Sequence, residues 1–207
     1  MEAAIAAASN GGVLTLTGDA KSTGVPVASG SNLTLDLNGH ELFMEGPFTG
    51  SEGTKTLGFQ FLKGSDVIIK NGTIRSTDAK MVIQNYSNLT LDNVTIIGSE
   101  TNQYLVSNNF GDVHFQNGTT LKASGKTVAF DVYYGMFEVY DDGVSVTIDT
   151  DDVVIEGKFE YGKASRATEE GFKANAHLYV PEGYPLTAPE GYTWKVVENG
   201  MQELVVL

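Results

Sequence analysis

The residues of this chain that could carry chemistry are its carboxylates and histidines, because its 207 residues include no cysteine. Five aspartates gather in one short stretch: Asp141, Asp142, Asp149, Asp151 and Asp152. Calcium takes six or more oxygen ligands, so a carboxylate-rich stretch is a candidate metal site. The spacing lacks the EF-hand pattern, and solvated turns between strands account for the same residues. We therefore expect no cofactor and keep calcium binding as the alternative.

Three further charged residues occupy one position in three successive repeats of the sequence: Asp36, Lys70 and Asp92. Two strand spacings would place the two carboxylates ~9–10 Å apart, close to the upper limit for an inverting glycosidase pair. A lysine between two aspartates is also the pattern of cross-strand ion pairs, which is the simpler interpretation. We therefore predict no catalytic residue, and a polysaccharide lyase or glycoside hydrolase remains the alternative.

The three histidines are His40, His114 and His177. They have no fixed spacing to one another or to an acid, so the sequence predicts neither a metal triad nor a nucleophile with its base. A phosphate-binding loop and a dinucleotide fingerprint are also absent from the sequence. Surface or turn positions are the expected role of these histidines.

The charge of the chain limits its partners. Asp and Glu number 26 against 13 Lys and Arg, which gives a net charge of −13. Such a chain repels nucleic acids and anionic lipids. No apolar stretch is long enough to cross a bilayer, and residues 1–5 lack the basic region of a signal peptide. We expect no nucleic-acid or membrane partner, and a protein that is made in a cytoplasm and leaves it by assembly or lysis.

The elements that would position these residues form an internal repeat. Four segments alternate apolar and polar residues, and a period of two predicts strands with one buried face. The segments begin at Asn32, Asp66, Asn88 and Asp112, and end at the asparagines Asn38, Asn71, Asn93 and Asn117. Two more short strands are predicted after each of the last three asparagines, and the second of them lies at 80–84, 103–106 and 127–132. Each repeat thus holds three strands in about two dozen residues, with no helix between them.

Three strands per repeat favour an all-β fold, a right-handed parallel β-helix in which like strands of successive coils stack about 4.8 Å apart. The four asparagines would form a structural ladder, because asparagine at one bend can bond to the neighbouring coils. It also tolerates the left-handed backbone conformation that the turn needs. The alternative is an antiparallel sandwich in which Asn-Gly pairs mark hairpin turns.

The two ends of such a solenoid need covers, because open strand edges promote association. Residues 2–8 are rich in alanine and predict a short helix that ends before Gly11 and Gly12. At the other end, residues 192–207 alternate around Asn199-Gly200, which predicts a β-hairpin with a type I′ turn.

We therefore divide one domain into three parts: a helical cap (1–12), the coils (13–162) and a C-terminal loop with the hairpin cap (163–207). Further strands are predicted at 136–140, 144–148 and 153–161, and residues 163–174 are expected to form a loop with at most one helical turn. Tyr184, Tyr192 and Trp194 are expected to pack the hairpin on the last coil, and an interaction surface is their alternative role.

Two segments carry a resemblance to a known family. Ala-Ala-Ile-Ala-Ala-Ala at 3–8 precedes Gly-Gly-Val-Leu-Thr-Leu-Thr-Gly-Asp at 11–19, and Asn-Leu-Thr-Leu-Asp-Leu-Asn-Gly-His follows at 32–40. The pattern resembles the pectin-lyase-like β-helix superfamily, and in particular its short members from bacteriophages and gut-bacterial surfaces. These members often close with a segment similar to residues 179–196. The resemblance spans most of the chain, but its motifs mark coils and caps. Of the motifs that the catalytic members use, only bare Asp-Asp pairs occur here.

The resemblance implies a non-enzymatic structural protein, a bacteriophage virion accessory such as a capsid decoration, head-fibre or tail protein. Its location would be the virion and its partners other capsid or tail proteins, with a homotrimer and a host-surface glycan as further possibilities of this class. One alternative is a carbohydrate-binding or polysaccharide-depolymerising module, which predicts exposed aromatic residues along a groove on one sheet. Another is a bacterial surface adhesion module.

Overall fold

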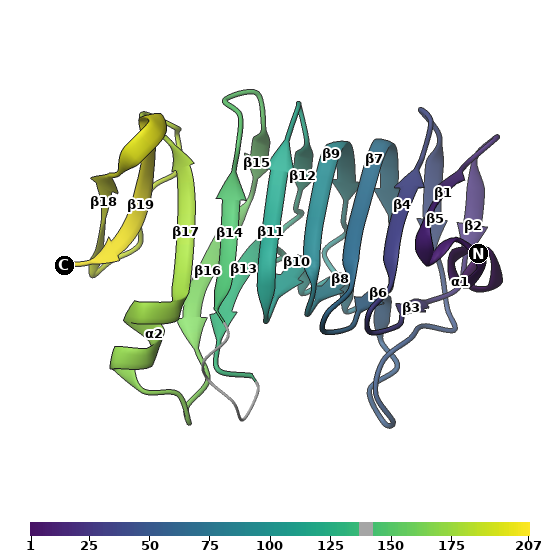
Figure 1. Ribbon diagram of the computed structural model, residues 1–207, viewed down its shortest axis with the longest axis horizontal. Coiled ribbons are helices and arrows are strands. Elements are labelled where there is room, and N and C mark those ends of the chain that lie inside the picture. Colours follow the sequence, from purple (N-terminus) through teal and green to yellow (C-terminus); the bar gives the residue numbers. More distant parts are fainter. Residues whose placement is uncertain (137–142) are drawn as a thin grey trace.

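The computed structural model describes residues 1–136 and 143–207 of the chain, and strands dominate it (Figure 1). The helices are α1 (Glu2–Ala8), α2 (Glu169–Asn175) and a short 3-10 turn, η1 (Glu198–Gly200). The strands of the N-terminal half are β1 (Asn10–Thr15), β2 (Ala20–Ser22), β3 (Val25–Val27), β4 (Asn32–Asp36), β5 (Glu41–Met44), β6 (Leu57–Phe61), β7 (Asp66–Arg75), β8 (Met81–Asn85) and β9 (Asn88–Ile97). Those that follow are β10 (Tyr104–Asn108), β11 (Gly111–Gln116), β12 (Thr120–Lys122), β13 (Val128–Tyr134), β14 (Val144–Ile148), β15 (Val154–Glu156), β16 (Lys158–Lys163), β17 (Ala176–Pro181), β18 (Tyr192–Val196) and β19 (Met201–Val206).

The strands form two sheets of parallel neighbours. The larger sheet has 13 strands, with β1-β4-β7-β9-β11-β14-β17 along its main path, and the smaller has six, in the order β3-β6-β8-β10-β13-β16. Apart from the antiparallel strands β18 and β19 at the C-terminal end, the strands that the structure describes pair in parallel with the like strand of the next repeat, as β7 and β9 do from Asp66↔Asn88 to Arg75↔Ile97. This parallel pairing confirms the all-β class with parallel strands, and it is incompatible with antiparallel hairpins at the Asn-Gly pairs of the repeats.

Alternation along the strands builds the core. Leu35, Ile69, Leu91, Phe115 and Ile148 lie in register on five neighbouring strands, and none is more than 1% exposed. Burial of one such side chain contributes about 1.5–3 kcal/mol. The alternation of apolar and polar residues along each strand therefore determines which face of the strand points inward.

The four asparagines of the repeat all adopt positive φ angles, as the sequence predicts: 50° at Asn38, 58° at Asn71, 57° at Asn93 and 52° at Asn117. Their amides bond to the preceding repeat. Asn93 donates to Asn71 Oδ1 (3.4 Å), whereas Asn71 and Asn117 donate to Asp36 Oδ1 (3.2 Å) and Asp92 Oδ1 (2.7 Å). The ladder is therefore a mixed column of asparagine and aspartate.

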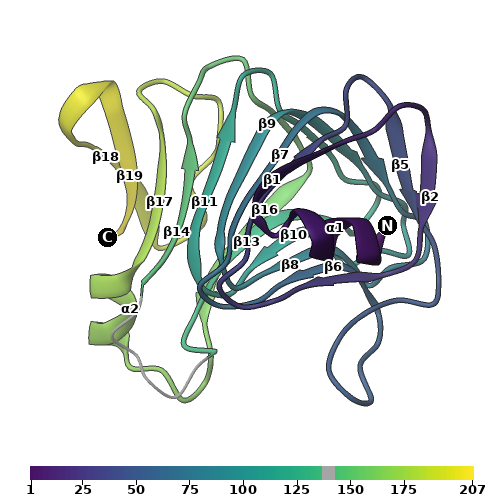
Figure 2. The same ribbon diagram turned by 45° about the vertical axis from the view of Figure 1, so that its right-hand side comes forward.

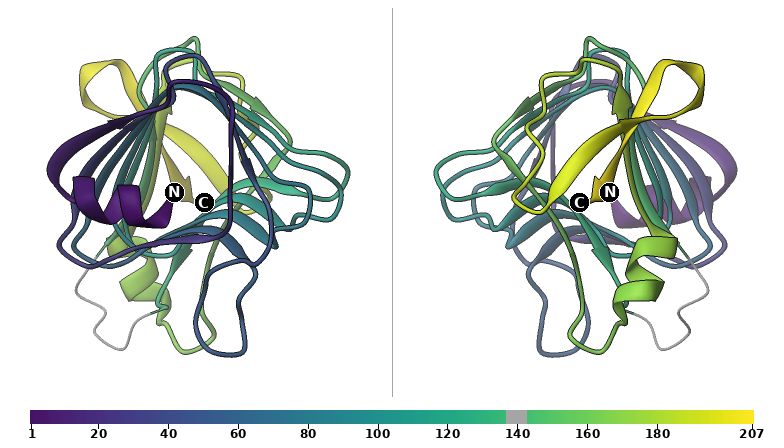
Figure 3. Two further views of the ribbon diagram at one scale, coloured as in Figure 1. Left: turned by 90° about the vertical axis from the view of Figure 1, so that its right-hand side faces the viewer. Right: turned by 90° about the vertical axis from the view of Figure 1, so that its left-hand side faces the viewer.

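The ends of the molecule differ in construction. Helix α1 contacts β1, β3 and β4 and buries Ile5, and it lies across the N-terminal end of the sheets (Figures 2 and 3). It ends at Ala8, as predicted. Strand β1 begins at Asn10, however, before the glycines that were expected to separate helix and strand. The reason is the pairing of Asn10 with Asn32, which draws that segment into the sheet.

At the C-terminal end, β18 and β19 form the predicted antiparallel hairpin. Asn199 and Gly200 have φ angles of 61° and 73°, and the Met201 N–H donates to Glu198 O, as in a type I′ turn. The Val197 N–H donates to Met201 O, so three residues, rather than two, lie between this last hydrogen-bonded pair.

The segment after residue 163 contains more structure than the sequence indicates. Thr168 caps α2 by accepting a hydrogen bond from the Gly171 N–H (3.0 Å), and Phe172 packs into the core. Strand β17 then pairs with β14 in parallel, so the repeat extends to Pro181. Of the strand expected at 136–140, only Met136 lies within the described residues. No helix among the described residues is long and apolar enough to span a membrane.

Candidate functional site

The ion-pair column on the larger sheet lies where the sequence predicts. Asp36, Lys70 and Asp92 are in register on β4, β7 and β9, and Lys70 Nζ lies 3.5 Å from Asp36 Oδ2. Burial acts to raise the pKa of Asp36, but hydrogen bonds from Asn71 and from the backbone N–H of Asn38, together with the Lys70 charge, lower it overall. The interpretation of Asp36 and Lys70 as a cross-strand ion pair is confirmed.

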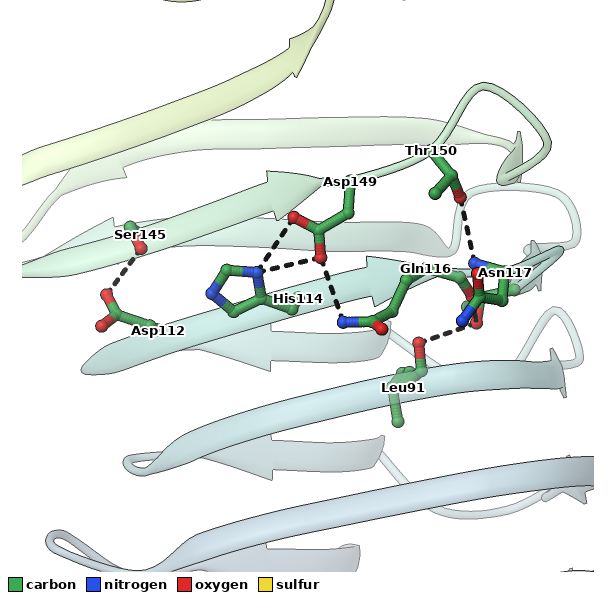
Figure 4. Close-up of polar contacts among 9 residues, drawn as sticks. Leu91, Asp112, His114, Gln116, Asn117, Ser145, Asp149 and Thr150 are labelled. Carbon is green, nitrogen blue, oxygen red and sulfur yellow. Dashed lines mark hydrogen bonds and ion pairs between the residues drawn. The ribbon is translucent and has the colours of Figure 1, made fainter. Parts of the chain in front are cut away.

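A second polar cluster surrounds His114 on β11 (Figure 4). His114 Nδ1 lies 3.0 Å from Asp149 Oδ2, which also accepts a hydrogen bond from Gln116 Nε2 (3.2 Å). The hydrogen bond with Asp149 raises the pKa of His114 against the effect of burial, and the charges of Asp149 and Asp112 add to it. The Ser145 hydroxyl donates to Asp112 Oδ1 (2.6 Å), so its proton is directed at a carboxylate rather than at the histidine. The cluster therefore lacks the serine–histidine contact of a nucleophilic site.

The other two histidines have the same kind of partner. His177 Nδ1 lies 2.7 Å from Glu203 Oε1, and His40 Nδ1 lies 3.5 Å from Asp19 Oδ1. Each histidine thus contacts an acid on a neighbouring strand or loop, at three separate places. The sequence did not reveal these pairs, because their members lie far apart in the sequence and only the pairing of strands brings them together.

The aspartates proposed as calcium ligands are only partly described. Asp141 and Asp142 lie outside the described residues. Asp149 belongs to the His114 cluster, and Asp152 accepts a hydrogen bond from Thr150 Oγ1 (2.6 Å). Within residues 1–136 and 143–207, no three acidic or histidine side chains gather as a metal ion would require.

The three aromatic residues near the C-terminus contact the core. Tyr184 is 8% exposed and donates its hydroxyl proton to Val153 O (2.7 Å), and burial raises its pKa to about 12. Tyr192 packs edge-on against Tyr161, with 5.3 Å between the ring centroids. Trp194 Nε1 donates to Leu186 O (2.8 Å). These contacts fit the predicted packing of the hairpin on the last coil.

The buried acid Asp131 is a site that the sequence did not reveal. It lies on β13 between the core residues Phe130 and Val132, so its side chain points to the outer face of the smaller sheet, where it is only 4% exposed. Asp131 Oδ1 accepts the Asn108 N–H (2.6 Å), and Oδ2 accepts the Ser107 hydroxyl proton (3.1 Å). Burial raises its pKa to about 7, which the two hydrogen bonds oppose and the charge of Glu160 supports.

Glu160 and two tyrosines surround this acid. Glu160 pairs with Asp131 on the neighbouring strand β16, and its Oε2 accepts the Tyr104 hydroxyl proton (3.0 Å). Burial raises the pKa of Tyr104 and also that of Tyr86, and the charge of Asp131 contributes in both cases. All of these groups lie on the outer face of the smaller sheet.

Two hollows lie on this face beside Tyr86 and Glu160, and Asp131 itself lines neither. One, of about 350 Å³, is lined by Gln60, Lys63, Tyr86 and Met136 among others. The second, of about 370 Å³, is lined by Tyr104, Lys126, Lys158 and Glu160 among others. Aromatic rings beside hydrogen-bonding polar groups are the usual lining of a site for a polar organic ligand. The predicted strands at 80–84, 103–106 and 127–132 contain Gln84, Tyr104 and Asp131 of this face. Alignment of the polar positions across these strands is the signal that would have revealed the site.

Comparison with known proteins adds no relative. The chain matches no family model, none of the curated proteins and none of the solved structures compared with it.

Proposed function

We propose that the chain is a right-handed parallel β-helix and a non-enzymatic structural protein, an accessory of a bacteriophage particle such as a capsid decoration or head-fibre protein. The observation that carries the proposal is the arrangement of parallel repeats between two unlike ends, a helix at one and an antiparallel hairpin at the other. Rigid repeats with covered ends suit a protein that must persist as a discrete body on a particle surface.

The contacts of the polar residues support this proposal. Asp36, Asp92 and Asp149 accept hydrogen bonds from neighbouring repeats, so their charges stabilise the stacking of the repeats. The net charge of −13 also keeps the surface soluble and repels nucleic acid.

The test is the location of the protein in a culture that produces the phage. Particles purified on a density gradient from a strain that encodes the chain are probed with an antibody against it. We expect the protein to migrate with the particles and to stay with them in high salt. Its recovery only in the cell envelope or in the free fraction would contradict the proposal and favour the adhesion module.

Carbohydrate recognition is the second candidate, and the site around Asp131 favours it. Tyr86 lines one hollow and Tyr104 the other, while Gln84, which bonds to Gln60 (2.9 Å), and Glu160 supply hydrogen-bonding groups on the same face. The carboxylates would repel an acidic polysaccharide, so the expected ligand is a neutral one.

Calorimetric titration with neutral oligosaccharides tests the second candidate. Binding that Tyr104→Ala abolishes, and that a Tyr184→Phe control retains, would support it. New reducing ends that appear with the wild type would show hydrolysis instead. Equal binding by Tyr104→Ala and the wild type would exclude this site.

A further inference from the structure

Strand β18 forms the outer edge of the larger sheet. It pairs with β19 on one side, and no other strand among the described residues pairs with its second side. The hairpin lies at the C-terminal extremity of the molecule, with β18 outermost (Figures 1 and 3). Such an edge offers a row of backbone donors and acceptors to a further strand.

The register of the hairpin identifies which backbone groups point outward. The Val197 N–H donates to Met201 O (2.9 Å), so these two residues form a hydrogen-bonded pair. Hydrogen-bonded pairs alternate along an antiparallel ladder, and Lys195 and Thr193 therefore bond towards β19. The N–H and C=O groups of Trp194 and Val196 then point away from it. The Tyr192 N–H is already bonded to Pro189 O (3.1 Å), which leaves its C=O on the outer side.

The charge of this strand differs from that of the chain. The five residues of β18 include no carboxylate and one cation, Lys195, although the whole chain carries −13. Within these five residues two copies therefore meet without carboxylate repulsion, and the nearest carboxylates, Glu190 and Glu198, lie just beyond the two ends of the strand. Val196 is 56% exposed and offers apolar surface beside the free edge.

We propose that two copies of this chain associate by antiparallel pairing of their β18 strands about a two-fold axis at Trp194. Trp194 exchanges both backbone hydrogen bonds with Trp194 of the partner subunit. The Val196 N–H donates to the C=O of Tyr192 of the partner subunit, whose ring covers the exposed valine. Lys195 faces Thr193 of the partner subunit. Like strands that pair about a two-fold axis form a closed interface, so the assembly ends at two copies.

The charge of Lys195 selects this register. A two-fold axis at Lys195 would satisfy the same outward backbone groups, but it would place the two lysines directly opposite each other, and like charges in that position are destabilising. The axis at Trp194 avoids this contact. The pairing involves five residues per chain, well below the area of a permanent interface, so we expect a concentration-dependent equilibrium.

Sedimentation equilibrium over a wide concentration range, at low and high salt, tests the proposal. The wild type should pass from monomer to dimer as its concentration rises. Val196→Pro removes an outward N–H that β19 does not use, and should weaken the dimer about tenfold or more. Thr193→Glu should tighten the dimer at low salt through Lys195 of the partner subunit, and Thr193→Lys should weaken it.

Thr34→Lys on the outward face of β4 is the control for the change in net charge. A wild type that stays monomeric or forms trimers would overturn the proposal. An equal response to Thr193→Lys and Thr34→Lys would overturn it as well. The two Thr193 variants keep the test decisive if Val196→Pro does not fold, and neither depends on the function proposed above.

Discussion

The outward faces of the two sheets both carry aspartates, but the surroundings of these aspartates move their pKa values in opposite directions. Asp36 on the larger sheet lies beside a lysine and accepts two hydrogen bonds, and its pKa lies below the usual value. Asp131 on the smaller sheet also accepts two hydrogen bonds but is buried beside another carboxylate, and its pKa rises to about 7. Both aspartates accept two hydrogen bonds, so the number of hydrogen bonds does not explain the difference. The comparison teaches that burial by neighbouring side chains decides whether a carboxylate on a sheet face is charged.

Replacement of the buried acid should have the largest effect. The unfolded chain releases the Asp131 proton near pH 3.8 and the folded chain near pH 7, so the folded state loses stability as the pH rises between these values. Asp131→Asn removes this loss and keeps an acceptor for the Asn108 N–H. We expect the variant to exceed the wild type in free energy of unfolding by up to about 4 kcal/mol at pH 8.

Urea denaturation at pH 5 and pH 8 measures this difference between the two proteins. The gain should shrink markedly at pH 5, where most of the wild-type carboxyl group is protonated in the fold. A variant that is less stable than the wild type at pH 8 would show that the carboxylate is stabilising and that the two faces do not differ as described.

Removal of the Tyr104 hydroxyl group, on the same outer face of the smaller sheet, should have the next largest effect. Tyr104→Phe removes the hydrogen bond to Glu160 and should cost about 1 kcal/mol, because the carboxylate loses a donor in a partly buried place. Thermal unfolding near pH 6 provides the measurement, and Tyr133→Phe on the neighbouring strand β13 is the matched control. Equal melting temperatures for both variants would argue that the hydroxyl of Tyr104 contributes no stability.

On the larger sheet, Asp149→Asn should lower the pKa of His114 towards its ordinary value of about 6.5. The stabilisation from the protonated pair is present below pH 6.5 and is lost as the pH rises through the folded-state pKa. It should amount to less than about 1 kcal/mol, because 41% of the histidine side chain is exposed and solvent screens the pair. A nuclear magnetic resonance titration of the imidazole provides the pKa. An unchanged value would mean that Asp149 does not control it.

The smallest effect is expected from Lys70→Met. The lysine is about a third exposed, so loss of its contact with Asp36 should cost under about 0.5 kcal/mol and disappear in high salt. Denaturation at two salt concentrations measures it. A loss of unfolding free energy as large as that of Tyr104→Phe would show that polar contacts on the two sheets contribute equally to stability.

The period of two and the recurrent asparagines were sufficient to predict the strands and the positive φ angles, because both are local properties of a repeat. The helix α2 was not predicted, since it has one buried residue, Phe172, and no repeating apolar pattern. Strand β17 was missed although its residues alternate with a period of two, because the segment with α2, which has no counterpart in the earlier repeats, stands before it. The raised pKa of Asp131 was not predictable from its own repeat, because Ser107, Asn108 and Glu160, which influence it, come from the neighbouring strands β10 and β16.

The register between like strands has an evolutionary consequence. Each repeat contacts chiefly the one before and the one after, as β9 contacts β7 and β11. Duplication or deletion of one whole repeat would therefore leave the helix at one end and the hairpin at the other with their contacts intact. Each such event would change the length of the molecule by about 4.8 Å. The length of the protein can thus change by whole repeats while the structures at its two ends stay the same.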